Sequence, residues 1–245
     1  PTPTAPPAQP PTSPAPSPTT VRSAAPSTTL GYGHPGGAAF LGDSGTLVVG
    51  TSAGLLSLST PELATLRFIP LDAPVRELAA SPDGRFLAAS SYDGATATTR
   101  LLAPDGAVLF SAPGRAAFFG ADSRLLGLAD LDNSTGRYTT RLYGLPDGAE
   151  LAAVPGDRAV LSPDAALIAS FDREELVVSA VGDGELLRAQ ATSAAFSPDG
   201  ATLAAAGFNG VELLPFGDGQ PLQDGRRTLT GELTLDVAFA PDGAL

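Results

Sequence analysis

A four-residue segment recurs along the chain, and it constrains the fold more than any other feature of the sequence. It reads Ser-Pro-Asp-Gly or a looser variant, and every copy contains an aspartate. Successive aspartates lie 35 to 43 residues apart. They are Asp43, Asp83, Asp122, Asp164, Asp199 and Asp242. A period of this length is typical of repeat proteins, in which one small unit buries its faces only by stacking on the next.

Each repeat has the pattern of four short strands joined by tight turns. An apolar stretch precedes the aspartate turn and another follows it, as in 194–196 and 203–206. The Asp-Gly pair at 93–94 and the Asn-Gly pair at 209–210 supply the positive φ that two-residue hairpins need. A third strand then ends in another turn, such as 104–106. Helical periodicity is absent, so the sequence predicts strands throughout the repeats.

Four short antiparallel strands at a period near 40 residues describe one blade of a β-propeller. The predicted fold class is therefore all-β, a β-propeller of four-stranded blades. We expect five complete blades, the first strand of a sixth, and a full ring of six to eight. We also expect 28–32 to supply the outer strand of the last blade. The five blades are predicted at 36–72, 75–112, 115–155, 158–190 and 193–229.

The repeats resemble those of the WD-repeat superfamily, and more closely its bacterial Ser-Pro-Asp-Gly variant. Residues 80–88 and 195–204 carry the resemblance best, and it extends over 36–245. This variant is found in Tol-type periplasmic propellers and in exported bacterial repeat proteins. The resemblance implies a propeller fold but specifies function hardly at all. Because the chain has no tryptophan and its single histidine precedes the first repeat, the Trp- and His-centred hydrogen-bond network of eukaryotic WD proteins is not carried over.

The chain divides by composition into an extended tether, 1–29, and the propeller, 30–245, which looks truncated in its sixth repeat. The first segment is almost entirely Pro, Thr, Ala and Ser, with Arg22 as its single charged residue. Such a segment buries too little apolar surface to offset its chain entropy, and we expect a polyproline-like conformation. One interpretation is a disordered tail. The other is a tether that follows an export signal, with any lipid-anchor cysteine lying before Pro1.

Composition excludes several kinds of chemistry. The chain has no cysteine, one histidine and, since all 14 basic residues are arginine, no lysine. Disulfides, thiolate nucleophiles, multi-histidine metal centres and lysine-dependent phosphate loops are therefore impossible. The net charge of −12 argues against nucleic acid as a partner, because phosphate binding needs clustered positive charge. The apolar runs are also too short to predict a transmembrane helix.

Two loops stand out as candidate sites. The first, 130–136, offers alternating oxygen ligands, with Asp130, Asp132 and Ser134 as a calcium candidate. It lacks the glycine and the bidentate glutamate of a standard calcium loop, so the alternative is an enlarged hairpin with no cofactor. The second is the Gly-rich loop around His34, for which a structural or solvent-exposed role is expected because the sequence offers it no clear catalytic partner. No catalytic residue is predicted.

These observations favour a non-enzymatic protein-binding or scaffolding propeller of the bacterial cell envelope, part of a larger assembly. Its expected partners are other envelope proteins, bound through the propeller faces and the N-terminal tether. The alternative is a metal-dependent enzyme or small-ligand binder with a carboxylate-lined central channel, so the question of enzymatic activity stays open. A third possibility is a cytoplasmic scaffold, which the tether segment disfavours.

Overall fold

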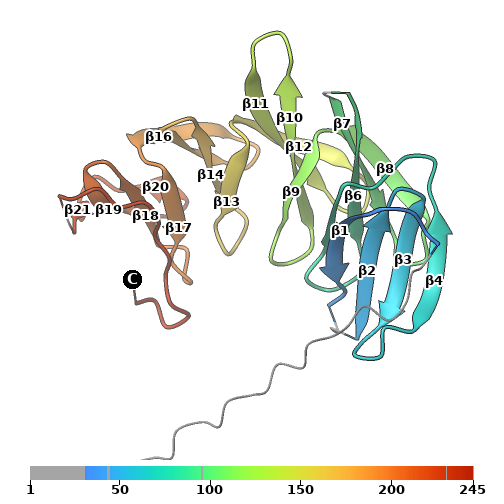
Figure 1. The fold of residues 1–245 in the computed structure, drawn as a ribbon. Coiled ribbons are helices and arrows are strands. Elements are labelled where there is room, and N and C mark those ends of the chain that lie inside the picture. Colours follow the sequence, from blue (N-terminus) through green and yellow to red (C-terminus); the bar gives the residue numbers. More distant parts are fainter. Residues whose placement is uncertain (1–30, 43–44, 95, 230, 245) are drawn as a thin grey trace, which may run out of the picture. The chain divides into compact units, whose positions relative to one another are not determined.

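The computed structural model describes residues 31–42, 45–94, 96–229 and 231–244, and these form antiparallel sheets without a helix (Figure 1). The part of the chain that the structure describes therefore contains no helix that could span a membrane. The predicted tether, 1–29, and most of the expected strand at 28–32 lie outside the described residues. Tyr32 itself is not part of a strand.

Five sheets follow one another along the chain, and each is a simple meander of neighbouring strands. The first sheet contains β1 (Pro35–Phe40), β2 (Thr46–Thr51), β3 (Gly54–Ser59) and β4 (Thr65–Pro70). The second contains β5 (Glu77–Ala80), β6 (Leu87–Asp93), β7 (Thr96–Leu102) and β8 (Val108–Pro113). The third contains β9 (Arg115–Phe119), β10 (Leu125–Asp132), β11 (Arg137–Gly144) and β12 (Ala149–Pro155).

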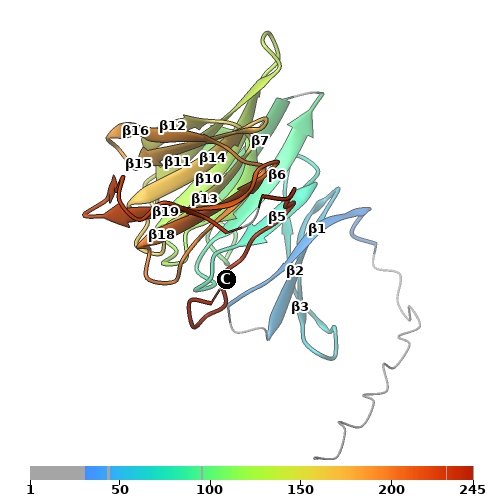
Figure 2. The ribbon, with the colours of Figure 1, turned by 90° about the vertical axis from the view of Figure 1, so that its left-hand side faces the viewer.

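The fourth sheet contains β13 (Arg158–Leu161), β14 (Leu167–Asp172), β15 (Glu175–Ala180) and β16 (Gly184–Gln190). The fifth contains β17 (Ser193–Phe196), β18 (Thr202–Gly207), β19 (Gly210–Gly217), β20 (Gln220–Pro221) and β21 (Arg227–Thr228). Figure 2 views the same sheets from the side of the fifth. The five predicted units are thus confirmed as five blades, and the fold is that of a β-propeller. The number of blades in a full ring stays a prediction.

Consecutive blades pack face to face through apolar side chains of their middle strands. Between the second and third blades, Leu101 and Leu126 are fully buried beside Ala88 and Phe86. Small residues at such positions let two sheets approach, while leucine and phenylalanine fill the remaining space. Similar clusters join the other neighbouring blades, so each blade covers a face that its neighbour would otherwise expose to water.

Buried hydroxyl groups fasten each blade to the next one at the second and third interfaces. The Thr99 hydroxyl donates to the carbonyl of Gly114 at 2.7 Å, and that of Thr140 donates to the carbonyl of Gly156 at 2.8 Å. Both glycines lie just before an inner strand and have positive φ, and a Cβ on Gly156 would lie 1.9 Å from the carbonyl oxygen of Phe171. Threonine hydroxyls therefore connect consecutive blades at these two interfaces.

The fifth blade differs from the prediction of a complete four-stranded unit ending at residue 229. Its outer edge consists of two short pieces, β20 and β21, which pair with different parts of β19. Pro221 in β20 and Pro215 in β19 have no backbone N–H, so a regular ladder between them loses donors. The chain leaves the sheet after Pro221 and returns at Arg227.

The expected first strand of a sixth blade is not a strand, although its residues are in place beside the fifth blade. Val237 and Phe239 pack against the cluster that contains Val211, and the Asp242 turn forms with a bond from Gly243 N to the carbonyl of Ala240. A β-strand requires hydrogen bonds to a neighbour. The described residues supply no second strand beside this segment, so the pairing that defines a strand is missing there.

Candidate protein-binding surface

The Ser-Pro-Asp turns at one end of the blades are held by the same set of hydrogen bonds. In the fourth blade the Ser162 hydroxyl donates to Asp164 at 2.6 Å and accepts from the Leu167 N–H at 2.9 Å. The Ala166 N–H donates to the same carboxylate oxygen at 3.1 Å. Corresponding bonds occur at Ser81, Asp83 and Phe86, and at Ser197, Asp199 and Thr202. In these three turns, the aspartate therefore stabilises its own turn.

These hydrogen bonds keep the turn aspartates ionised. The Ser162 hydroxyl and the backbone N–H of Ala166 lower the pKa of Asp164. Burial alone would raise the pKa of Asp83, but the hydrogen bonds from Ser81 and Arg85 outweigh it and hold that pKa well below its usual range. These aspartates therefore stay ionised to a lower pH than an ordinary aspartate does.

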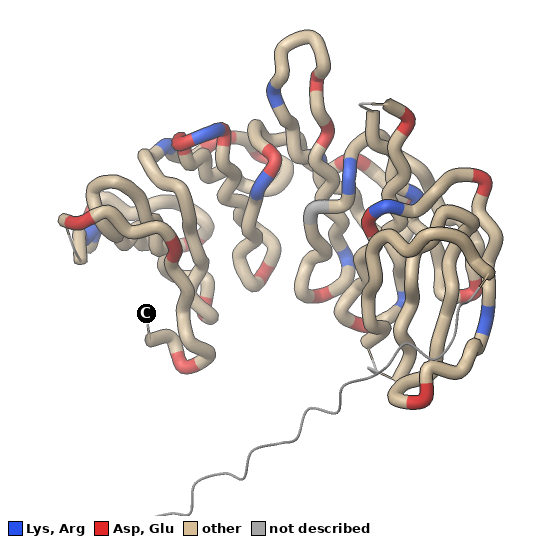
Figure 3. Tube along the Cα trace, in the orientation of Figure 1, with Lys and Arg blue, Asp and Glu red and all other residues tan. Residues whose placement is uncertain are grey.

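Acidic residues are distributed over this whole end of the propeller, which we call the turn face. It consists of the connections from first to second strands and from third to fourth strands, and every such connection that the structure describes completely carries one acidic residue. They are Glu62, Asp83, Asp105, Asp122, Asp147, Asp164, Asp183, Asp199 and Asp218. Figure 3 shows the acidic residues at the turns. In these described connections the basic residues are Arg85 and Arg124.

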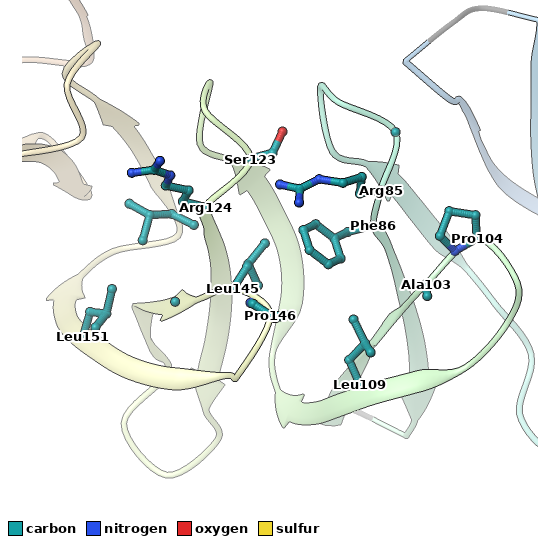
Figure 4. A pocket seen from close by; sticks show the side chains of 13 residues that line it. Arg85, Phe86, Ala103, Pro104, Leu109, Ser123, Arg124, Leu145, Pro146 and Leu151 are labelled. Carbon is teal, nitrogen blue, oxygen red and sulfur yellow. The ribbon is translucent and has the colours of Figure 1, made fainter.

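An open groove of about 900 Å³ lies between the second and third blades and reaches the turn face (Figure 4). Its apolar lining comes from both blades: Phe86, Pro104, Leu109, Leu125, Leu145 and Leu151. Leu109 on β8 and Leu151 on β12 are 41% and 43% exposed, and both belong to the strands at the outer edges of their sheets. Exposed apolar side chains gathered in one groove mark a surface that another molecule can cover.

The groove has a rigid base, because the two blades interlock below it. The rings of Phe110 and Tyr143 contact each other with centroids 5.7 Å apart. The turn that follows β11 comes so close to the second blade that a Cβ on Gly148, where φ is +72°, would lie 2.6 Å from the ring of Phe110. The base of the groove is therefore built into the packing of the two blades, while its rim includes turn residues such as Arg85, Pro104 and Pro146.

Two arginines distinguish the rim of this groove from the rest of the turn face. Arg85 forms an ion pair with Asp83, and Arg124 forms one with Asp122 at 3.8 Å. Both side chains line the groove, and Figure 4 shows them on the side of the groove where Ser123 lies. The corresponding positions of the fourth and fifth blades hold Ala166 and Ala201. The rim therefore combines paired charges with an apolar floor, which suits a polypeptide better than a small polar ligand.

The calcium candidate lies at the opposite end of the blades, at the tip of the β10–β11 hairpin. Strand pairing continues to Asp132 and Arg137. The hairpin is therefore enlarged by longer strands, and the turn that joins them is short. The Ser134 hydroxyl and N–H donate to one carboxylate oxygen of Asp132, and the Thr135 hydroxyl donates to the other. These bonds lower the pKa of Asp132 to about 2.

This geometry gives Asp132 a role within its own turn. Asp130 lies within β10 and pairs with Thr139, and the hydrogen bonds of the turn join Asp132 to Ser134 and Thr135. Among the residues that the structure describes, no three His, Cys, Asp or Glu side chains gather closely enough to hold a metal. The two Asp132 oxygens already accept protein hydrogen bonds, and a calcium ion would have to replace them. Calcium binding here stays a prediction.

The two other charged or polar features singled out by sequence lie at the surface. His34 is exposed, and its backbone exchanges bonds with Ser52, whose hydroxyl accepts from the His34 N–H at 3.0 Å. The charged residues at 172–175 close the hairpin between β14 and β15, with 173 and 174 as its turn. Asp172 there contacts Arg137 of the third blade at 3.6 Å. Neither feature borders the groove.

Comparison with known proteins supports the fold. Residues 66–96 match the family model of the WD domain, G-beta repeat. This match begins in β4 of the first blade and ends at the start of β7, so the sequence unit is offset from the blade. A solved structure named "Crystal Structure of Mitotic Checkpoint Complex" is similar, with a TM-score of 0.56 and 15% identity over 88% of this chain and 71% of that one. No curated protein matches the chain.

These findings support a β-propeller fold with a WD-type repeat at 66–96. At 15% identity, the solved structure shows the fold alone. The sequence prediction missed the groove itself, although two signals pointed to it. Arginine stands two positions after the turn aspartate in two consecutive repeats only, and the fourth strands of these repeats contain leucines at positions that the blades leave exposed.

Proposed function

We propose that this protein is a non-enzymatic binding propeller of the bacterial cell envelope, and that it holds another protein in the groove between its second and third blades. The observation that carries the proposal is the exposure of Leu109 and Leu151 on a preformed apolar surface that both blades build. Burying such side chains against a partner contributes roughly 25 cal/mol per Å² of apolar area. The rigid base of the groove keeps the entropic cost of binding low.

The envelope location is supported by the sequence. The Ser-Pro-Asp-Gly repeats resemble those of exported bacterial propellers, and the Pro- and Thr-rich residues 1–29 have the composition of a tether. In this proposal the tether links the propeller to the envelope, and the groove selects the partner protein.

A photo-crosslinking experiment in the producing bacterium tests both parts. A photoreactive amino acid replaces Leu109 in the full chain, and the matched control carries it at Phe208. Phe208 is 58% exposed in the β18–β19 hairpin, at the opposite end of the blades. We expect the protein to fractionate with the envelope and a discrete crosslinked partner to appear from Leu109 but not from Phe208.

Two results would overturn the proposal. A purely cytosolic distribution would rule out the envelope assignment. Identical crosslinking patterns from Leu109 and Phe208 would show that the groove is not the binding surface.

A further inference from the structure

The groove between the second and third blades also indicates the chemistry of its occupant. Its floor requires apolar side chains, because the leucines and Phe86 offer no hydrogen-bonding groups of their own. A volume of about 900 Å³ accommodates a few side chains of a polypeptide rather than a folded domain. The occupant is therefore a segment with exposed apolar residues.

The charges around the groove do not balance. Arg85 and Arg124 are each paired with the aspartate of their own turn, and these four charges cancel. Two more carboxylates belong to the turns that carry the lining residues Pro104 and Pro146. Asp105 and Asp147 immediately follow these prolines, and both are exposed.

Neither of these two aspartates forms an ion pair within the part of the chain that the structure describes. Asp105 accepts a hydrogen bond from the Ala107 N–H at 3.0 Å, which leaves its charge uncompensated. The charged residues that line the groove itself are Arg85 and Arg124, but the turns around it are together net negative, and they lie on a face that carries an acidic residue in every completely described turn. A positively charged segment is favoured here both by the local carboxylates and by the wider field of the face.

The groove between the fourth and fifth blades has a different lining. It holds about 260 Å³, and its carboxylates come from Asp164, Asp199 and Asp218. Alanines stand in place of the two arginines, and no leucine from an outer strand contributes to its wall. Its apolar lining, which includes Leu167 and Phe216, is smaller and offers less surface to hold a bound chain.

We infer that the groove between the second and third blades binds an extended segment of a partner protein in which apolar residues alternate with basic ones. The apolar side chains contact Leu109 and Leu151, and the basic side chains lie against Asp105 and Asp147. The inference rests on the proposed function, and it names the chemical class of the segment that the groove takes.

Fluorescence anisotropy with labelled synthetic peptides tests the inference on the full chain. The probe is a short peptide in which leucine alternates with lysine, and the matched peptides carry glutamate or glutamine in place of lysine. We expect the lysine peptide to bind at least about tenfold more tightly than the glutamate peptide, with the glutamine peptide between them. Equal or tighter binding of the glutamate peptide would overturn the inference.

Leucine variants locate the binding. L109Q and L151Q change exposed side chains, so the fold is retained, and circular dichroism verifies this. Each variant is expected to bind the lysine peptide about tenfold more weakly than the unchanged chain does. The control is L66Q, because Leu66 is 57% exposed in β4, the outer strand of the first blade. If L66Q weakens binding as much as L109Q does, the peptide binds elsewhere and the inference fails.

Charge variants test the rim. The double variant D105N/D147N is expected to bind the lysine peptide severalfold more weakly than the unchanged chain at low salt. This difference in affinity should shrink as salt is added. Its control, D183N/D218N, removes the same number of carboxylates from equivalent turns of the fourth and fifth blades. Equal weakening by both double variants would mean that only the general field of the face acts, and would overturn the assignment of Asp105 and Asp147.

The peptide assay and the crosslinking experiment fail separately. A partner captured through Leu109 by an acidic segment would leave the proposed function standing and contradict the inference. Loss of the Leu109 crosslink would contradict both.

Discussion

Two turns at opposite ends of the propeller contain the same hydrogen bond in different surroundings. In the fourth blade, the hydroxyl of Ser162 donates to Asp164 at 2.6 Å; at the tip of the β10–β11 hairpin, Ser134 donates to Asp132 at the same distance. In both turns the bond lowers the pKa of the aspartate. Ser162, however, is buried, whereas Ser134 is exposed.

The two turns differ in the other hydrogen bonds that each serine hydroxyl makes. Ser162 also accepts the N–H of Leu167, the first residue of β14, so the turn and the strand depend on one buried atom. Ser134 bonds only within its own turn, where water can replace it. A lowered pKa therefore reports a local bond in both turns, but burial decides how much the bond contributes to the stability of the fold.

The largest effect is expected from a substitution in the interior that supports both ends. Leu126 on β10 is fully buried between the second and third blades. Leu126→Ala should lower the free energy of unfolding by about 2–5 kcal/mol, because it removes apolar contacts and leaves a cavity. Chemical denaturation measures this. The control is Leu66→Ala, at an exposed position. If Leu126→Ala lowered the free energy of unfolding by less than this control does, the blade interface would not be the core.

Ser162→Ala compared with Ser134→Ala tests the difference between the two turns directly. The first is expected to cost about 1–3 kcal/mol, because it leaves the buried Leu167 N–H without its acceptor. The second should stay within about 0.5 kcal/mol, as for most surface substitutions. Denaturation midpoints of the two variants provide the measurement, and equal losses would mean that burial does not distinguish the turns.

Acid should weaken the fold gradually through the turn aspartates. The pKa of Asp164 is lower in the folded protein than its ordinary value of 3.8, so folding favours the ionised form. Its contribution is complete above that ordinary value and is lost as the pH falls through the lower pKa of the folded state. We therefore expect the free energy of unfolding to decrease as the pH falls below about 4.

The same titration on Ser162→Ala provides the control. Without the hydroxyl, the pKa of Asp164 should return toward its ordinary value, so this variant should lose less stability over the same range than the unchanged chain. An identical pH dependence in both proteins would show that the turn bond does not shift the titration of Asp164.

The smallest effect is expected from calcium. Both oxygens of Asp132 already accept hydrogen bonds from Ser134 and Thr135, so the melting temperature should be the same in calcium and in chelator. If calcium instead raised the melting temperature, and if Asp132→Asn abolished this increase, a calcium site at the hairpin tip would be established.

The strands, the turns and the blade period could all be predicted from the residues alone. Each depends on residues close together in the chain. The hydrogen bonds of the Ser-Pro-Asp turns join residues at most five apart in the chain. A glycine or asparagine in a hairpin turn permits the positive φ that the turn needs, whatever the rest of the fold. The blades could therefore be predicted to within a few residues of their observed bounds.

The contacts between blades could not be predicted in this way, because they depend on how separate sheets pack. The groove joins Phe86, Leu109 and Leu151, which share no local pattern and meet only because two sheets pack with a particular offset. The hydroxyl of Thr99 finds the carbonyl of Gly114 in the same way. Pairing is also non-local. The apolar residues near Val237 have a strand-like pattern, yet they form no strand, because a strand needs a neighbour that sequence alone does not place.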